Sequence, residues 1–176
     1  MTRIIAGAAG GRRLRTPPGQ DTRPTTDRVR EALFSALGDV GGARVLDLFA
    51  GSGALGLEAA SRGAARVTFV ESGRAALAVL RRNVADLELP GTEVVAADVS
   101  RFLSGRPRPH DLVLADPPYA TAPAPLLELL VGWLVPGARV VLERGRDGVD
   151  PDLPVGLELV RRRDYGGTSL WYLRST

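Results

Sequence analysis

The chain has 176 residues, a length that suits one domain with a single hydrophobic core. It contains no cysteine and one histidine, which leaves almost no material for disulfides, zinc sites, iron–sulfur clusters or a Ser-His-Asp triad. The formal net charge is +3, and all 23 basic residues are arginines. We therefore expect a single-domain protein that works without a metal ion.

No segment of the sequence predicts contact with a membrane. The most apolar stretch, residues 126–142, is interrupted by Glu128, Pro136 and Arg139 and is too short to span a bilayer. The apolar run at the N-terminus is too brief for a signal peptide. Together with the absence of cysteine, these features predict a cytoplasmic protein, and nothing indicates more than a monomer.

Positive charge is concentrated at the start of the chain. Residues 1–30 carry seven arginines against two aspartates, so this segment has a net charge of +5 and the remainder −2. Residues 3–15, with a Gly-Gly turn, predict a β-hairpin, and residues 16–26 predict a loop. We therefore predict a basic RNA-binding appendage over residues 1–26, followed by a catalytic domain over residues 27–176.

The rest of the chain alternates short apolar strands with helices. A helix is predicted to begin at Thr26 or Asp27, either of which can cap it, and to end at Leu37. Strands are predicted at residues 45–49, 66–71, 93–96, 112–115 and 139–142, and helices at residues 54–61, 74–86 and 125–134. Because these strands are apolar on both faces, they indicate an α/β fold with a parallel sheet covered by helices on both sides. Residues 157–164 and 168–173 flank a Gly-Gly turn and predict an antiparallel hairpin at the end of the sheet.

Four carboxylates lie at or near the ends of consecutive predicted strands: Asp47, Glu71, Asp98 and Asp116. Ligands of open parallel sheets bind beyond the carboxyl ends of the strands, so these four side chains belong to one edge. A single acid in such a place is a common helix cap, whereas four on one edge predict a binding site.

A glycine-rich loop follows the first of these acids. Residues 51–56 spell the G-x-G-x-x-G fingerprint of dinucleotide sites, and taken alone they fit NAD or FAD as well as another nucleotide, or merely a tight turn. Asp47 lies inside the preceding strand, where it would repel a pyrophosphate but attract a cation such as the ammonium group of S-adenosylmethionine. In that cofactor, Glu71 would hold the ribose diol and Asp98 would accept from the adenine amino group.

The segment Asp116-Pro117-Pro118-Tyr119 is the most specific signal in the sequence. Two prolines directly after an apolar strand stop the ladder and make the turn rigid. The Asp116 carboxylate and the Pro117 carbonyl can then accept both hydrogens of an exocyclic amino group, while Tyr119 stacks on the base. The alternative, a rigid turn with a core tyrosine, fits its position beside the other three acids less well.

These motifs resemble those of a known enzyme family. Residues 47–53 (Asp-Leu-Phe-Ala-Gly-Ser-Gly) and 116–119 are similar to those of class I amino-methyltransferases. With Arg3-Ile-Ile-Ala-Gly, Gly11-Arg-Arg-Leu and the segment from Thr22 to Phe34, nearly the whole chain resembles the RsmD family of bacterial 16S rRNA guanine-N2 methyltransferases. Lysines are common in the hairpin of relatives, whereas only arginines occur here, and both neutralise phosphate.

The resemblance implies a Rossmann-like, mostly parallel seven-stranded sheet with S-adenosylmethionine as methyl donor and S-adenosylhomocysteine as product. The implied substrate is 16S rRNA within the assembled or assembling small ribosomal subunit. Catalysis is assigned to Asp116, Pro117, Pro118 and Tyr119. Cofactor binding is assigned to Thr26, Asp47, Phe49, Ala50, Gly51, Gly53, Glu71, Asp98 and Asp116. RNA binding is assigned to Arg3, Arg12, Arg13, Arg15, Arg23 and Arg28.

Three other functions stay open at this stage. A DNA adenine-N6 or cytosine-N4 methyltransferase would share the Asp-Pro-Pro-Tyr chemistry but usually carries a target-recognition region for which this chain has little room. An NAD-dependent oxidoreductase fits the glycine loop but not Asp47, and a non-catalytic RNA-binding assembly factor would not need four aligned acids. His110 is expected at the surface or in a loop, without a role, and Trp133 and Trp171 are expected to pack in the core.

Overall fold

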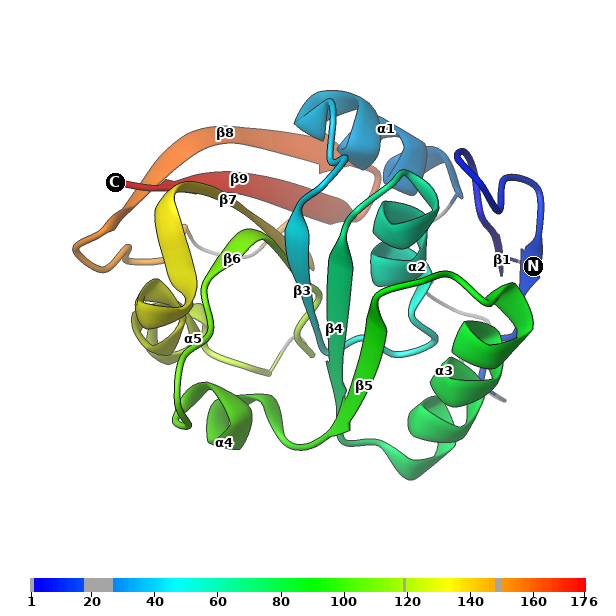
Figure 1. The fold of residues 1–176 in the computed structure, drawn as a ribbon. Helices are drawn as coiled ribbons and strands as arrows, with labels where there is room; N and C mark the ends of the chain where they lie inside the picture. The colour runs from blue at the N-terminus through cyan, green and yellow to red at the C-terminus, as the bar shows by residue number, and fades with distance from the viewer. Residues whose placement is uncertain (1, 18–26, 119, 148–149) are drawn as a thin grey trace.

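A computed structural model of the protein describes residues 2–17, 27–118, 120–147 and 150–176. Its main element is a seven-stranded sheet with the order β5-β4-β3-β6-β7-β9-β8 (Figure 1). The strands are β3 (Arg44–Leu48), β4 (Arg66–Glu71), β5 (Thr92–Ala96), β6 (His110–Ala115), β7 (Leu134–Gly145), β8 (Leu157–Tyr165) and β9 (Thr168–Ser175). The first five are parallel, and β9 runs antiparallel to both of its neighbours. The predicted α/β class, with a closing antiparallel hairpin, is confirmed.

Helices cover both faces of this sheet. They are α1 (Asp27–Leu37), α2 (Ala54–Ser61), α3 (Arg74–Leu87), α4 (Val99–Leu103) and α5 (Pro123–Leu130), followed by the 3-10 turn η1 (Val131–Trp133). Adjacent residues of β3 point to opposite faces of the sheet. Val45 is buried in the cluster that holds residues of α1, α2 and α3, and Leu46 in the cluster that holds residues of α4 and α5. None of the helices within the described residues is long and apolar enough to cross a membrane.

The observed helices differ from the predicted ones in two places. Helix α4 was not predicted, because its five residues are too few to show a helical period. The helix predicted over residues 125–134 ends at Leu130, since the chain tightens into η1 and Leu134 already belongs to β7.

The predicted N-terminal hairpin is present and packs on the same core. Strand β1 (Thr2–Arg3) pairs antiparallel with β2 (Arg13–Leu14). Ile4, Ala9 and Leu14 are buried in the cluster that also holds α1, α2 and α3. Gly7 has a φ of +83°, and a Cβ there would lie 1.8 Å from the carbonyl oxygen of Ser61 at the end of α2. The hairpin therefore lies directly against α2.

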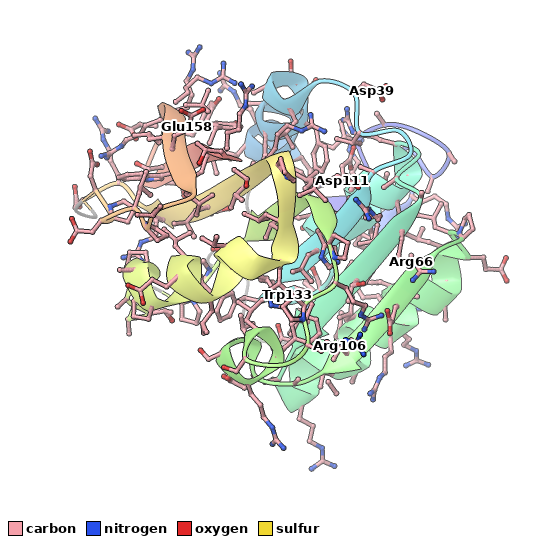
Figure 2. The ribbon with its side chains drawn as sticks, turned by 60° about the vertical axis from the view of Figure 1, so that its left-hand side comes forward. Asp39, Arg66, Arg106, Asp111, Trp133 and Glu158 are labelled. Carbon is pink, nitrogen blue, oxygen red and sulfur yellow. The ribbon has the colours of Figure 1, made fainter. Side chains whose placement is uncertain are left out.

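The single histidine is buried, so its prediction as a surface or loop residue was wrong. His110 opens β6 with 5% of its surface exposed, and its ring stacks on Trp133 with 6.0 Å between centroids. Burial lowers the pKa of His110. Trp133 lies beside α4 and donates from Nε1 to the carbonyl oxygen of Leu103 at 3.0 Å (Figure 2). The prediction that Trp133 and Trp171 pack in the core is confirmed.

Candidate active site

The four predicted carboxylates lie in the last residues of four neighbouring parallel strands or just beyond them. The strand order reverses between β3 and β6, because the chain builds β4 and β5 on one side of β3 and then crosses to the other. Open α/β sheets bind their ligands at such a switch point. Asp47 on β3 pairs with Leu114 on β6, and the N–H of Asp116 donates to the carbonyl oxygen of Leu48 at 3.4 Å. Asp47 therefore lies in β3, and Asp116 directly follows β6, the two strands that flank the switch point.

Asp47 is a buried acid with little compensation for its charge. Its exposed fraction is 2%, and among the described residues its carboxylate accepts one hydrogen bond, from the N–H of Gly56 to Oδ2 at 2.8 Å. Burial raises the pKa of Asp47 well above its ordinary value; the Gly56 bond lowers it, and the charges of Asp116 and Glu71 raise it further. A buried carboxyl group beside two other acids is a favourable place for a cationic ligand.

The glycine loop between β3 and α2 is held in a left-handed conformation. Phe49, Gly51 and Gly53 have φ values of 58°, 57° and 83°. This conformation is unusual for a phenylalanine, and such strain is characteristic of functional loops. At Gly53 the positive φ disfavours any other residue, and a Cβ there would lie 2.5 Å from Cδ1 of Leu80 on α3, which would have to shift. The buried Ala50 accepts at its carbonyl oxygen from the N–H of Gly53 at 2.7 Å. The backbone of this loop is thus fixed close to the sheet edge.

Sequence reasoning missed a third glycine with a clear structural requirement. Gly56 lies in α2 and donates to Asp47, and a Cβ at this position would lie 2.8 Å from Asp47 Oδ2 and 2.3 Å from Cε1 of Phe69. The signal was available as the last glycine of the G-x-G-x-x-G pattern. Gly56 allows α2 to approach β3 closely enough for its N–H to reach the buried carboxylate.

Glu71 and Asp98 both hold the backbone near the sheet edge. Glu71 Oε2 accepts from the N–H of Gly51 at 2.8 Å, and Oε1 accepts from the N–H groups of Ser72 and Gly73 at 2.8 and 2.7 Å. Asp98 is exposed and caps α4, with Oδ1 accepting from the N–H of Arg101 at 3.0 Å. Glu71 therefore ties the glycine loop to the end of β4, while Asp98 caps α4 through Oδ1.

The Asp-Pro-Pro segment begins directly after β6. Asp116 and Pro118 are exposed and Pro117 is buried, whereas Tyr119 lies outside the described residues. The carbonyl oxygen of Pro118 accepts from the N–H of Thr121 at 2.8 Å. Arg144 on β7 donates from Nη1 to the carbonyl oxygen of Thr121 at 2.7 Å. Sequence reasoning did not identify Arg144, which anchors the far side of this turn to the neighbouring strand.

Several of the arginines predicted to bind RNA make contacts within the protein. Arg3 pairs with Asp27 at 3.5 Å, Arg15 pairs with Asp86 at 3.2 Å, and Arg12 donates to the carbonyl oxygen of Asp86. All three keep exposed surface. Arg13 and Arg28 are exposed, and Arg23 lies outside the described residues. Thr26, which was predicted to bind the cofactor, also lies outside the described residues. The positive charge that the hairpin offers to a ligand is therefore smaller than the number of its arginines suggests.

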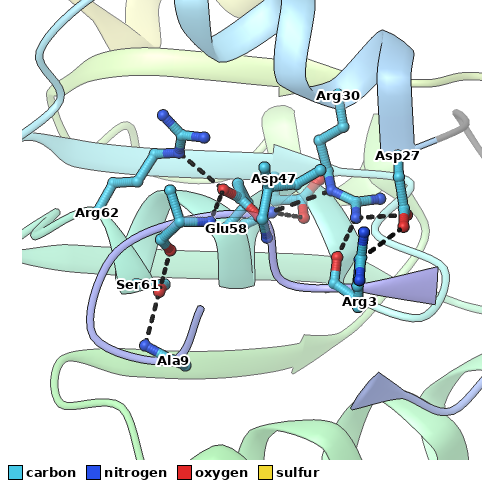
Figure 3. Close-up of polar contacts among 11 residues, drawn as sticks. Arg3, Ala9, Asp27, Arg30, Asp47, Glu58, Ser61 and Arg62 are labelled. Atoms are coloured by element: carbon cyan, nitrogen blue, oxygen red, sulfur yellow. Dashed lines mark hydrogen bonds and ion pairs between the residues drawn. The ribbon is translucent and has the colours of Figure 1, made fainter. Parts of the chain in front are cut away.

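A buried ionic cluster, which the sequence did not reveal, joins the hairpin to α1 and α2 (Figure 3). Glu58 and Arg30 have fully buried side chains, with 3.7 Å between Glu58 Oε2 and Arg30 Nε. Arg62 donates to Glu58 Oε1 at 2.7 Å. The N–H groups of Ile5 and Ala6 donate to the two oxygens of Glu58 at 2.7 and 3.1 Å. Arg30, although counted in the basic N-terminal segment, therefore contributes nothing to a surface for RNA.

The described residues contain no group of three or more histidine, aspartate or glutamate side chains that could hold a metal ion.

A protein-family model described as conserved hypothetical protein 95 matches residues 2–174. The chain is 41% identical over 171 residues to ribosomal RNA small subunit methyltransferase D of Escherichia coli strain K12, covering 93% of this chain and 85% of that protein. It is 35% identical to the putative rRNA methyltransferase YlbH of Bacillus subtilis, with 96% of both chains covered. The solved structure of the putative methyltransferase yhhF from Escherichia coli superposes with a TM-score of 0.89 at 39% identity, covering 98% of this chain and 97% of that one.

Proposed function

Since this chain belongs to the conserved hypothetical protein 95 family, the RsmD family of the sequence analysis, we propose that it methylates small-subunit ribosomal RNA with S-adenosylmethionine as donor. The observation that carries the proposal is the placement of two acids, Asp47 and Asp116, on opposite sides of the switch point. Asp47 is buried and Asp116 is exposed, and the charge of Asp116 raises the pKa of Asp47. One carboxylate suits a cationic cofactor held inside the fold, and the other suits a substrate that arrives from outside.

The residues on the cofactor side fit S-adenosylmethionine, which supplies a methyl group on a positively charged sulfur when bound. Asp47 pairs with the ammonium group of its methionine moiety, because a cation restores the charged form of a buried carboxyl group. The backbone of residues 49–53, with Phe49, Ala50, Gly51 and Gly53, borders this moiety.

The remaining two acids bind the nucleoside part of the cofactor. A carboxylate offers about four acceptor positions, and three of those on Glu71 are occupied by backbone N–H groups. Glu71 therefore accepts from one ribose hydroxyl through Oε2, unless a backbone bond at Oε1 is exchanged for the second. Asp98 keeps Oδ1 on its helix cap and accepts from the adenine amino group with Oδ2.

On the substrate side, the target is the exocyclic N2 amino group of a guanine in 16S rRNA. The Asp116 carboxylate and the Pro117 carbonyl accept its two hydrogens, which turns the nitrogen lone pair toward the methyl group. Asp116 would also stabilise the positive charge that develops on nitrogen as the N–C bond to the methyl group forms and the sulfur–methyl bond breaks, with S-adenosylhomocysteine as the leaving group. Tyr119 is proposed to stack on the base. The surplus proton leaves to Asp116 or to water, so positioning and electrostatics supply the rate enhancement.

The N-terminal segment, residues 1–26, is proposed to be the RNA-binding part of the chain, with residues 27–176 forming the methyltransferase domain. Arg13 and Arg28 are exposed. Arg3 and Arg15 can exchange their carboxylate partners for phosphate, and Arg12 can exchange the carbonyl oxygen of Asp86. Because phosphate contacts release counterions, RNA affinity should fall steeply as the salt concentration rises.

The first test is transfer of labelled methyl from S-adenosylmethionine to small ribosomal subunits from cells that lack this gene, followed by identification of the nucleoside. N2-methylguanosine in 16S rRNA supports the full proposal. Another methylated nucleoside in 16S rRNA overturns the guanine-N2 assignment alone. Transfer to duplex DNA but not to rRNA would favour the DNA amino-methyltransferase instead.

The role of Asp116 is tested by Asp116→Ala in the same assay. Loss of a preorganised charge at the reacting atom typically lowers turnover by about 100- to 1,000-fold. Affinity for S-adenosylhomocysteine should stay within a few-fold of wild type, because the cofactor is held mainly by Asp47, Glu71 and the glycine loop. Near-normal turnover in this variant would contradict the mechanism.

A further inference from the structure

Helix α3 presents one polar residue on its buried face. Leu77, Leu80, Asn83 and Leu87 are its buried residues, and their spacing places them on one side of the helix. Asn83 has an exposed fraction of 2%. Burying an amide in such a row is costly unless its donors and acceptor are used.

The side-chain amide of Asn83 joins three segments of the chain. Its Nδ2 donates to the carbonyl oxygen of Ser52 at 2.8 Å and to that of Arg15 at 3.0 Å. Its Oδ1 accepts from the N–H of Arg15 at 2.9 Å. Both amide donors are therefore in use. The orientation is unambiguous, since the flipped amide would direct N–H groups at the N–H of Arg15 and an oxygen at two carbonyls.

Ser52 lies at the centre of the glycine loop, and Asn83 holds its carbonyl oxygen. Gly51 is held by Glu71 and Gly53 by Ala50, at 2.8 and 2.7 Å. Ser52 lies between these two glycines, which are both in the left-handed conformation. Its carbonyl oxygen accepts a hydrogen bond from Asn83 on α3. Rotation of this peptide would turn the backbone of both glycines away from the conformation in which they border a ligand.

The same amide fixes the end of the N-terminal hairpin. Asn83 bonds to both backbone groups of Arg15, and one turn along α3 Asp86 contacts the side chains of Arg12 and Arg15. Helix α3 thus supports the hairpin and the glycine loop through adjacent positions on its surface.

We propose that Asn83 is a positioning residue for the cofactor, acting through the carbonyl of Ser52, and that it holds the N-terminal hairpin in register with the cofactor loop. This role rests on the proposed function, because it requires that the glycine loop binds S-adenosylmethionine. Asn83 itself touches neither cofactor nor substrate. Its removal therefore weakens cofactor binding while leaving the chemical step intact.

The test compares Asn83→Ala and Asn83→Asp with the matched control Leu87→Ala. Leu87 lies on the same face of α3, is 6% exposed and has an apolar side chain that makes no hydrogen bond to the loop or the hairpin. Affinity for S-adenosylhomocysteine is measured by calorimetry below the unfolding temperature of each variant. Both Asn83 variants should bind about 3- to 10-fold more weakly, the effect of one lost hydrogen bond, whereas Leu87→Ala should lose stability with unchanged affinity.

Two further measurements separate positioning from a general loss of stability. At saturating S-adenosylmethionine both Asn83 variants should recover a kcat near that of wild type, with the defect confined to KM for the cofactor. Amide exchange at Arg15 should be faster in Asn83→Ala but close to wild type in Asn83→Asp, which keeps an acceptor for that N–H but has no donor for Ser52. The isosteric Asn83→Asp variant also carries the test if Asn83→Ala fails to fold.

The outcomes distinguish this role from the proposed function. If the wild-type chain binds S-adenosylhomocysteine and both Asn83 variants bind it equally well, the role of Asn83 is overturned and the proposed function stands. A matching loss of affinity in Leu87→Ala also overturns it, since the effect would then be one of helix stability. A wild-type chain that binds neither S-adenosylmethionine nor S-adenosylhomocysteine overturns both.

Discussion

Asp47 in β3 and Glu58 in α2 are both removed from water, but their surroundings are opposite. Their exposed fractions are 2% and 0%. Glu58 accepts from two backbone N–H groups and from Arg62, and forms an ion pair with Arg30. Asp47 accepts from one backbone N–H among the described residues and has the acids Asp116 and Glu71 as its charged neighbours.

This difference distinguishes Glu58, an acid with a structural role, from Asp47, the acid proposed to bind a ligand. A buried charge is tolerated where hydrogen bonds and opposite charges replace water, as at Glu58. Where they do not, burial raises the pKa of the group, as at Asp47. Because a buried group with few internal partners is a candidate for binding a ligand, we propose that Asp47 belongs to the binding site, whereas Glu58 stabilises the fold.

The largest effect is expected on breaking the structural cluster. Glu58→Ala removes the buried counter-charge of the Arg30 guanidinium, which keeps only the half-buried Asp27 at 2.9 Å, and it leaves the N–H groups of Ile5 and Ala6 without an acceptor. We expect a loss of about 3–5 kcal/mol in the free energy of unfolding, measured by urea denaturation. The double variant Arg30→Met/Glu58→Leu should be less destabilised than the single one, because it buries no lone charge. A loss below about 1 kcal/mol in Glu58→Ala would show that the two acids do not differ as argued.

The second effect concerns binding rather than stability. Asp47→Asn keeps the shape of the side chain and an acceptor for the N–H of Gly56 but removes the charge proposed to pair with the ammonium group. A charge-assisted hydrogen bond contributes about 1.5–3 kcal/mol, so affinity for S-adenosylhomocysteine should fall by about 10- to 150-fold. Calorimetry measures this, and binding within two-fold of wild type would remove Asp47 from the site.

The pH dependence of stability gives a third, independent view of Asp47. Because its folded pKa is raised, the folded state binds more protons than the unfolded state once the pH exceeds the ordinary value of 3.8. Asp47 thus lowers the stability of the ligand-free protein progressively from that pH up to its raised pKa. Asp47→Asn removes this dependence, so its stability relative to wild type should increase over the same range. Thermal unfolding at a series of pH values checks the sign, and a relative decrease would contradict it.

The contrast also explains what the sequence could and could not predict. Runs such as residues 66–71 specify their strand by local pattern, and this strand has the predicted bounds. The acids at strand ends were found because topology places them on one edge. Glu58, Arg30 and Asn83 were missed, because a charged or amide residue in a helix is usually exposed and nothing local shows its partners. The hydrogen bond from Ile5 to Glu58 spans 53 residues of sequence. The prediction for His110 was wrong for a similar reason, because the tryptophan that covers it lies in η1, far along the chain.

The smallest effect is expected at an exposed acid that is fully paired. Asp111 accepts from the N–H, Nε and Nη2 of Arg44 at 2.8, 2.8 and 3.0 Å, and this pairing lowers the pKa of Asp111 to about 2. A lowered pKa stabilises the folded state above the ordinary value of 3.8, and the contribution is lost as the pH falls toward about 2. The side chains of Arg44 and Asp111 are 42% and 36% exposed, so water and salt screen the pair. Asp111→Asn should therefore lower the free energy of unfolding at pH 7 by less than about 1 kcal/mol, and by still less in 1 M salt. With three hydrogen bonds, Asp111 is bonded nearly as fully as Glu58, so a loss comparable to that of Glu58→Ala would mean that bond number, rather than removal from water, determines how much each acid contributes.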